Sequence, residues 1–140
     1  MARASPDAKA CIFCDIAAHR IPAYIVYEDA EAVAFLDLFP FTRGHLLVVP
    51  KHHVARLTEL PPAEYAPYVR ALATMCRRVD RLTRDYNVSS NQGAAAGQIV
   101  FHLHFHVIPR YGEANPFHTA PRERLSEEDA RTLVATLSAP

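Results

Sequence analysis

The segment from Gly97 to Pro109 constrains the fold most, because its apolar and polar residues alternate strictly. A period of two residues is typical of a β-strand, in which successive side chains point to opposite faces. One face would carry apolar side chains for a core, namely Ile99, Phe101, Leu103, Phe105 and Val107. The other face would carry four polar side chains, namely Gln98, His102, His104 and His106. The sequence therefore predicts a strand over this whole segment.

Three histidines on one face of a strand indicate a functional site. Near neutral pH, histidine serves in metal ligation and in nucleophilic or proton transfer. Residues two apart on a strand lie about 6.6 Å apart at Cα, so each imidazole can have a separate role. The alternative is an exposed row of histidines without a function, and the unbroken apolar face opposite argues against it.

The size and charge of the chain limit its function. Its 140 residues suit one domain, 1–140, that can bury a core. Fifteen Lys and Arg balance 15 Asp and Glu, so we expect neither nucleic acid nor a membrane as a partner. Apolar runs of about nine residues are shorter than the roughly 20 that span a bilayer. We expect a soluble, cytoplasmic protein without a signal peptide.

The pair Cys11 and Cys14, in a C-x-x-C spacing, has two functional interpretations. It could be a thioredoxin-like redox pair, or it could be half of a zinc site. A redox pair favours a βαβ context with a helix continuing from the cysteines, and the sequence shows neither. Zinc needs two further ligands, and these must be histidines because Cys76 lies on the apolar face of an expected helix. Of the adjacent His52 and His53, at most one can face the same metal.

The other elements follow from local patterns. Residues 1–8 are small and polar, and we expect them to fray. Apolar runs predict a hairpin of strands 24–27 and 32–37, a strand over 45–49 and a short strand over 87–91. Apolar spacing of three and four predicts a helix over 62–86, with a kink or a later start at Pro67. The C-terminal extension, 111–140, would contain a helix from Ser126 to about Leu137, begun by a capping box.

The pattern Asn91-x-Gly93-x-x-x-Gly97-Gln98-x-x-x-His102-x-His104-x-His106 resembles the signature of the histidine triad (HIT) superfamily of nucleotide hydrolases and transferases. The resemblance extends over roughly residues 11–110, through Ile21-Pro22-Ala23, Tyr27-Glu28-Asp29, Ala34-Phe35-Leu36-Asp37, Gly44-His45 and Pro50-Lys51-x-His53. It implies an α+β, HIT-like fold with a bent antiparallel sheet of about five strands, one long helix and a C-terminal helix. It also implies a homodimer that joins two sheets.

The resemblance implies three catalytic roles. His104 is similar to the nucleophile that attacks the α-phosphorus and forms a nucleotidyl-histidine, which splits one displacement into two easier ones. His106 matches the triad histidine beside the transferring phosphate. His45 matches the upstream histidine that supports it.

The resemblance also implies the nucleotide contacts. Gln98, Asn91 and the Gly97 backbone resemble groups that hold phosphate oxygens, which suits a reaction that depends on positioned donors. Asp37 aligns with a carboxylate that binds the ribose hydroxyls. An apolar slot for the base is implied at Ile12, Phe13, Phe35 and Leu38.

The metal ligands follow from the same resemblance. Zinc-containing bacterial members of the family place ligands at four matching positions, here Cys11, Cys14, His53 and His102. Such a closed tetrahedral set would hold one structural zinc ion. It would join the N-terminal segment to the histidine strand.

The chain departs from the family pattern at two places. Ile99 stands where many members have the Ser or Thr that contacts the departing group. Pro109-Arg110 resembles the bacterial and diadenosine-polyphosphate branches more than the phosphoramidase branch. We therefore expect hydrolysis of purine nucleoside phosphoramidates or dinucleoside polyphosphates, with a weak preference for the amide. The alternatives are a hydrolase with zinc on His102, His104 and His106, and a nucleotide-binding protein without turnover.

Overall fold

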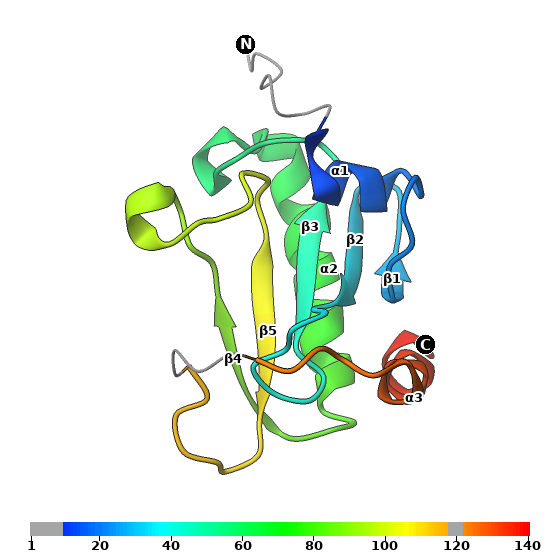
Figure 1. Ribbon diagram of the computed structural model, residues 1–140. Coiled ribbons are helices and arrows are strands. Elements are labelled where there is room, and N and C mark those ends of the chain that lie inside the picture. Colours follow the sequence, from blue (N-terminus) through cyan, green and yellow to red (C-terminus); the bar gives the residue numbers. More distant parts are fainter. Residues whose placement is uncertain (1–9, 118–121) are drawn as a thin grey trace.

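The structure, a computed structural model, describes residues 10–117 and 122–140 (Figure 1). Residues 1–8, which we expect to fray, lie outside these ranges. In chain order the elements are α1 (Ile12–Ala17), β1 (Ile25–Glu28), β2 (Ala32–Leu36), β3 (Leu46–Pro50), α2 (Tyr65–Val79), β4 (Asp85–Ser89), β5 (Phe105–Arg110) and α3 (Glu127–Ser138).

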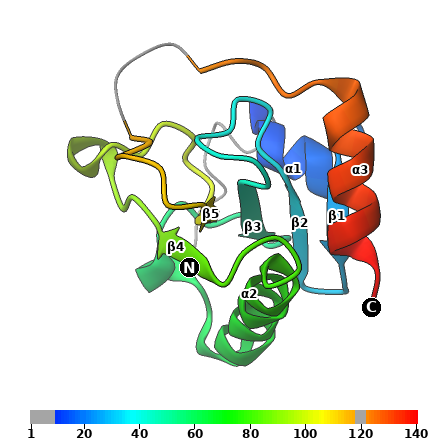
Figure 2. The ribbon, with the colours of Figure 1, turned by 90° about the horizontal axis from the view of Figure 1, so that it is seen from below.

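The strands form one antiparallel sheet in the order β1-β2-β3-β5-β4. The central strands β2 and β3 are buried along their whole length, so side chains on both of their faces are covered. α2 lies against one face of the sheet, and α3 packs beside β1 and α2 (Figure 2). This sheet with its helices confirms the expected α+β fold with an antiparallel sheet of five strands, one long helix and a C-terminal helix.

Alternation along β2 and β3 divides the interior into two clusters. Val48 and Leu36 belong to the larger cluster, which includes Met75 of α2 and Leu133 of α3. The smaller cluster lies on the opposite face, between the sheet and α1, and contains Phe13, Ile16, Val33, Phe35, Leu47 and Val49. His106, which lies opposite Leu47, is on this second face.

The histidine strand is shorter than the sequence predicts. β5 begins at Phe105, and the chain from Gln98 to His104 is a loop. The pairing of β5 with β3 stops at Val48 and Phe105, although β3 itself continues to Pro50. The Leu103 N–H instead donates to the carbonyl of Val54, in the loop after β3 (2.7 Å).

The core face predicted for this segment is therefore only partly correct. Leu103 and Val107 are buried, but Ile99 and Phe101 are 86% and 44% exposed. In the sequence, the alternation of polar and apolar residues continues past the end of the strand pairing. It therefore wrongly predicted that Ile99 and Phe101 face the core.

The helix predicted over 62–86 is α2, and it begins later and ends earlier. A 3-10 turn at Pro62–Glu64 precedes it, and Pro67 lies in its first turn, where no intrahelical bond is lost. This confirms the expected later start. The helix ends at Val79, whose carbonyl accepts from the N–H groups of Leu82 and Thr83. The last helix begins at Ser126, whose side chain accepts from the Asp129 N–H as expected.

Candidate functional site

The histidines of the triad are placed by β5 and the loop that precedes it. His106 lies opposite Leu47 in the pairing of β5 with β3, and cross-strand partners share a face. That face is the one covered by α1, because Leu47 belongs to the cluster of Phe13. The Phe13 ring packs edge-on against His102 and His104, with centroid distances of 6.0 and 5.1 Å.

His45 and His106 form a hydrogen-bonded pair whose tautomers the backbone determines. The Phe41 N–H donates to His45 Nδ1 (3.0 Å), so the proton of the neutral ring lies on Nε2. His45 Nε2–H then donates to His106 Nδ1 (2.9 Å). His106 therefore keeps its own proton on Nε2 and presents an N–H donor.

Both members of this pair are neutral near pH 7. Burial, with the nearby His106, lowers the pKa of His45 to about 2. Burial, with the nearby His104, lowers the pKa of His106 to about 4. The pair can therefore donate hydrogen bonds, but it does not hold a cationic imidazolium.

His104 has the opposite tautomer. Its Nδ1 lies 2.7 Å from the carbonyl oxygen of His102, which can only accept, so Nδ1 carries the proton. Burial is the main cause that lowers the pKa of His104, which favours the neutral ring. The Nε2 atom is left with a lone pair, as nucleophilic attack requires.

Two cysteines and two histidines form a cluster behind this imidazole. Cys11 and Cys14 come from the start of α1, His53 from the loop after β3, and His102 from the loop before β5. His102 Nδ1 lies 3.4 Å from Cys11 Sγ and 3.5 Å from Cys14 Sγ. His53 Nδ1 lies 3.2 Å from both Cys14 Sγ and His102 Nδ1. All four candidate ligand atoms lie within 4.8 Å of one another.

The chemistry of this cluster fits zinc. Ligand atoms at about 2.0–2.3 Å from a tetrahedral zinc ion are about 3.3–3.8 Å from one another, close to the separations observed here. His102 Nε2–H donates to the Pro50 carbonyl (2.7 Å), so the lone pair on Nδ1 faces the sulfur atoms. Burial and the adjacent Cys11 raise the pKa of the Cys14 thiol to about 12, so a cation is needed to stabilise its thiolate.

The histidine strand does not form the alternative metal site. Among the residues the structure describes, a second group with ligand atoms close together is Asp37, His45 and His106, and neither group contains His104. The facing nitrogens of His45 and His106 already bond to each other. A zinc ion held by His102, His104 and His106 together is therefore contradicted by the geometry, because His102 turns its Nδ1 to the cysteines.

The structure brings together only some of the residues expected to contact the base and the ribose. Phe35 packs edge-on against Phe13 (5.4 Å between centroids), beside His104. Asp37 accepts from the Phe39 N–H (2.8 Å) and lies 3.6 Å from His45 Nε2, and burial raises its pKa. Leu38, the next residue, is partly exposed.

Ile12 is exposed, whereas Phe35 is buried. Ile12 lines a hollow of about 290 Å³ beside the metal cluster, together with Ile99 and Phe101.

The loop before β5 is held by Gln98. Its Oε1 accepts from the Gly93 N–H (2.8 Å), and its Nε2 donates to the carbonyls of Ala55 (2.8 Å) and Val100 (3.1 Å). Both amide protons are used, so the expected donation from Gln98 to a phosphate is not supported, and Gln98 fixes the loop instead. Asn91 is exposed and donates to the Gly97 carbonyl (3.3 Å).

Sequence reasoning missed two residues beside the triad. The Phe41 ring stacks on His45, with 5.5 Å between centroids and 14° between planes. The Arg122 guanidinium lies 4.1 Å from the centroid of the Phe41 ring. Neither residue belongs to a periodic segment or to the triad motif, so no sequence signal marked them.

A five-stranded antiparallel sheet that presents the His102-x-His104-x-His106 segment is the arrangement expected of a histidine triad domain. The HIT domain model matches residues 18–113, and the chain belongs to the HIT family. An uncharacterised HIT-like protein of Methanocaldococcus jannaschii is 46% identical over 102 residues, which cover 72% of this chain and 79% of that protein.

Two further relatives bear on the chemistry. The adenosine 5′-monophosphoramidase of Candida albicans is 38% identical over 110 residues, or 74% of this chain and 72% of that protein. A zinc-bound histidine triad family protein from Mycobacterium smegmatis has a TM-score of 0.79 and 37% identity, over 94% of this chain and 95% of that one. None of the helices in residues 10–117 and 122–140 is long and apolar enough to cross a bilayer.

Proposed function

We propose that this protein hydrolyses purine nucleoside phosphoramidates or dinucleoside polyphosphates and releases a nucleoside monophosphate. The observation that carries the proposal is the bond from His104 Nδ1–H to the His102 carbonyl, which leaves Nε2 ready to attack phosphorus. The phosphoramidase relative and the family support hydrolysis at the α-phosphate.

The reaction takes two displacements. His104 Nε2 forms a bond to the α-phosphorus while the bond to the leaving group breaks, and the leaving group takes the electron pair. A water oxygen then attacks phosphorus, the P–N bond breaks, and its electron pair returns to Nε2. The two protons of the water end on the released products or in solvent. The His102 carbonyl stabilises the positive charge that His104 gains while it is bonded to phosphorus.

His106 and His45 assist without themselves reacting. The Nε2–H of His106 donates to an oxygen of the phosphate or of the leaving group, and the bond from His45 fixes that tautomer. Asp37 accepts from the ribose hydroxyls, and the Phe13 and Phe35 rings contact the base. Asn91 and the Gly97 backbone border the phosphate, while Gln98 holds their loop.

The proposed zinc ion has a structural role. Cys11, Cys14, His53 and His102 would hold it, and the metal would supply only a cross-link between α1 and the loop before β5. The zinc-bound relative supports zinc binding, and the close Cys₂His₂ cluster supports this ligand set. Because the cysteines must be reduced, we place the protein in a reducing compartment, the cytoplasm.

We propose a homodimer that buries the exposed face of α2 and the edge strand β4. Val69 on α2 is 58% exposed and Val88 on β4 is 42% exposed. Val69 lines two neighbouring hollows, one with Tyr86 and Val88 and the other with Leu57 and Tyr65. β4 is an edge of the sheet with all its residues exposed, so a second copy can cover both features.

The test is hydrolysis by the purified, zinc-loaded protein. Adenosine 5′-phosphoramidate and a diadenosine polyphosphate are assayed side by side, and AMP release is expected from at least one. His104→Ala should abolish release while retaining zinc and the folded state. Absence of AMP from both substrates would instead favour a nucleotide-binding protein without turnover.

A further inference from the structure

The hydrogen-bonded pair of His45 and His106 can hold its two protons in either of two ways. In the first, each ring carries its proton on Nε2, and His106 presents an N–H donor. In the reverse arrangement each proton lies on Nδ1, so His106 Nδ1–H donates to His45 Nε2. The Nε2 atom of His106 then has only a lone pair. In that state His106 could not donate to a phosphate oxygen.

The backbone N–H of Phe41 selects between these arrangements. It donates to His45 Nδ1 (3.0 Å), whereas a proton on that nitrogen would point at the Phe41 N–H. Asp37 Oδ2 lies 3.6 Å from His45 Nε2, further than a hydrogen bond, so this carboxylate selects more weakly. The tautomer of His106 therefore depends on the position of one backbone N–H in the loop between β2 and β3.

Two hydroxyl groups fasten this loop to the end of β5. The Thr42 hydroxyl donates to the Pro109 carbonyl (2.5 Å), and the Tyr111 hydroxyl donates to the carbonyl of Arg43 (2.6 Å). The two bonds run in opposite directions, one from the loop to the strand and one back. Gly44, at φ 90°, allows the close approach, because a Cβ atom there would lie only 3.2 Å from Pro109 Cγ. The loop is therefore clamped just before His45.

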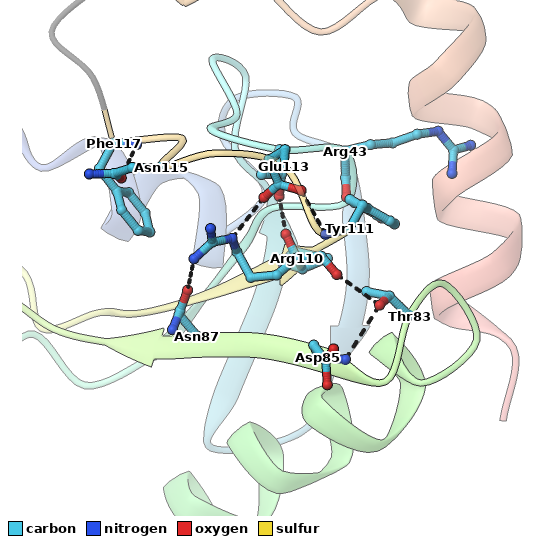
Figure 3. A network of polar contacts seen from close by, with 11 residues as sticks. Arg43, Thr83, Asp85, Asn87, Arg110, Tyr111, Glu113, Asn115 and Phe117 are labelled. Atoms are coloured by element: carbon cyan, nitrogen blue, oxygen red, sulfur yellow. Dashed lines mark hydrogen bonds and ion pairs between the residues drawn. The ribbon is translucent and has the colours of Figure 1, made fainter.

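Tyr111 is itself held by contacts that reach β4. Its N–H donates to the Glu113 carboxylate (2.7 Å), which also accepts from Arg110 (2.7 Å). Arg110 donates to Asn87 of β4 (2.8 Å), and its carbonyl accepts from the Thr83 hydroxyl (2.8 Å), as Figure 3 shows. The segment after β5 is therefore a fixed support for the loop.

We propose that Thr42 and Tyr111 are positioning residues that fix the tautomer of His106. Both hydroxyls bond to backbone carbonyls, so they act through the loop, whose Phe41 N–H must stay against His45 Nδ1. The inference rests on the proposed function and deepens it, since the donor on His106 is the group that would meet the phosphate or the leaving group.

Two substitutions remove the hydroxyls and little else. Thr42→Val and Tyr111→Phe each delete one hydrogen bond, which corresponds to about a 2- to 10-fold change in an equilibrium. In the double variant both bonds are lost, so the Phe41 N–H should leave His45 in a large share of molecules. Thr42→Ser keeps a hydroxyl and should behave as the wild type.

Nitrogen NMR of protein with isotopically labelled histidine reports the tautomer of each ring directly. In the wild type, His45 and His106 should both carry the proton on Nε2. In the double variant, the signals of His106 should shift toward those of a ring with its proton on Nδ1. With a substrate that the zinc-loaded wild type hydrolyses, kcat should fall by about 2- to 10-fold. KM should change less, because the base and ribose contacts remain.

Thr83→Val is the matched control. It removes a hydroxyl bond to the Arg110 carbonyl from the other side of the same segment, and the loop between β2 and β3 keeps both of its anchors. We expect wild-type tautomers and kinetics from it. A His106 proton that stays on Nε2 in the double variant, or an equal shift in Thr83→Val, would overturn the inference. Failure of the wild type to release AMP would overturn the proposed function, and the tautomers would still decide the inference.

Discussion

Removal of the metal should open α1 while the rest of the fold persists. The perturbation is chelation of zinc, or Cys14→Ala, which removes a ligand from the cluster. The helix has six residues, far fewer than an isolated helix needs for stability. It therefore depends on its tertiary contacts and on the cross-link.

The magnitudes of the opposing effects are comparable. Phe13 and Ile16 are 7% and 6% exposed, and their burial stabilises the docked helix by about 3–6 kcal/mol in total. Fixing the backbone of this helix costs about 6–12 kcal/mol, and each backbone hydrogen bond returns about 1 kcal/mol. Without the metal the balance is near zero, so the helix should open in a large fraction of molecules.

Hydrogen exchange measures this opening directly. In protein without zinc, the amides of residues 12–20 should lose protection, while β2, β3 and α2 keep theirs. Cys76→Ala is the matched control, because this third cysteine lies on α2 outside the cluster, and its exchange pattern should equal that of the wild type. Unchanged protection of α1 after complete zinc removal would refute the reasoning.

Three further predictions follow from the site and the surface. The free energy of unfolding should fall as the pH drops from about 6.5 through 4. In this range His45 and His106 bind protons in the unfolded chain, whereas in the folded protein their lowered pKa values keep them neutral. Denaturant titrations at several pH values should show a smaller fall for His106→Gln than for the wild type. Asp37→Ala should lose more activity on ribonucleotides than on 2′-deoxy analogues, since one of the two hydroxyl partners is already missing there; equal losses would exclude a contact of Asp37 with the 2′-hydroxyl. Val69→Asp should convert a dimer into a monomer with unchanged secondary structure, as measured by light scattering.

Much of the fold was predictable because its signals are local. The hairpin of β1 and β2, the strand β3 and the capping of α3 by Ser126 follow from runs of a few residues. The limits of β5 were not predictable, because they depend on where its pairing with β3 stops. The same tertiary cause explains the exposure of Ile99 and Phe101.

The candidate site likewise has some features that the sequence predicts and others that it does not. The Cys₂His₂ set could be anticipated, since its spacing and residue types resemble a known pattern, and the geometry brings all four residues together. Two features of the site depend on contacts between distant segments. Gln98 holds its loop through side-chain hydrogen bonds, and Arg122 stacks on Phe41, which in turn stacks on His45. No pattern within one segment could have indicated them.

The central claim is that His104 carries the nucleotide between two displacements at phosphorus. The most direct test is hydrolysis of an adenylyl substrate with a chiral phosphorothioate at the α-position, in isotopically labelled water. Each in-line displacement inverts phosphorus, so two of them predict net retention of configuration. Net inversion would show a single displacement by water and would contradict the covalent role of His104.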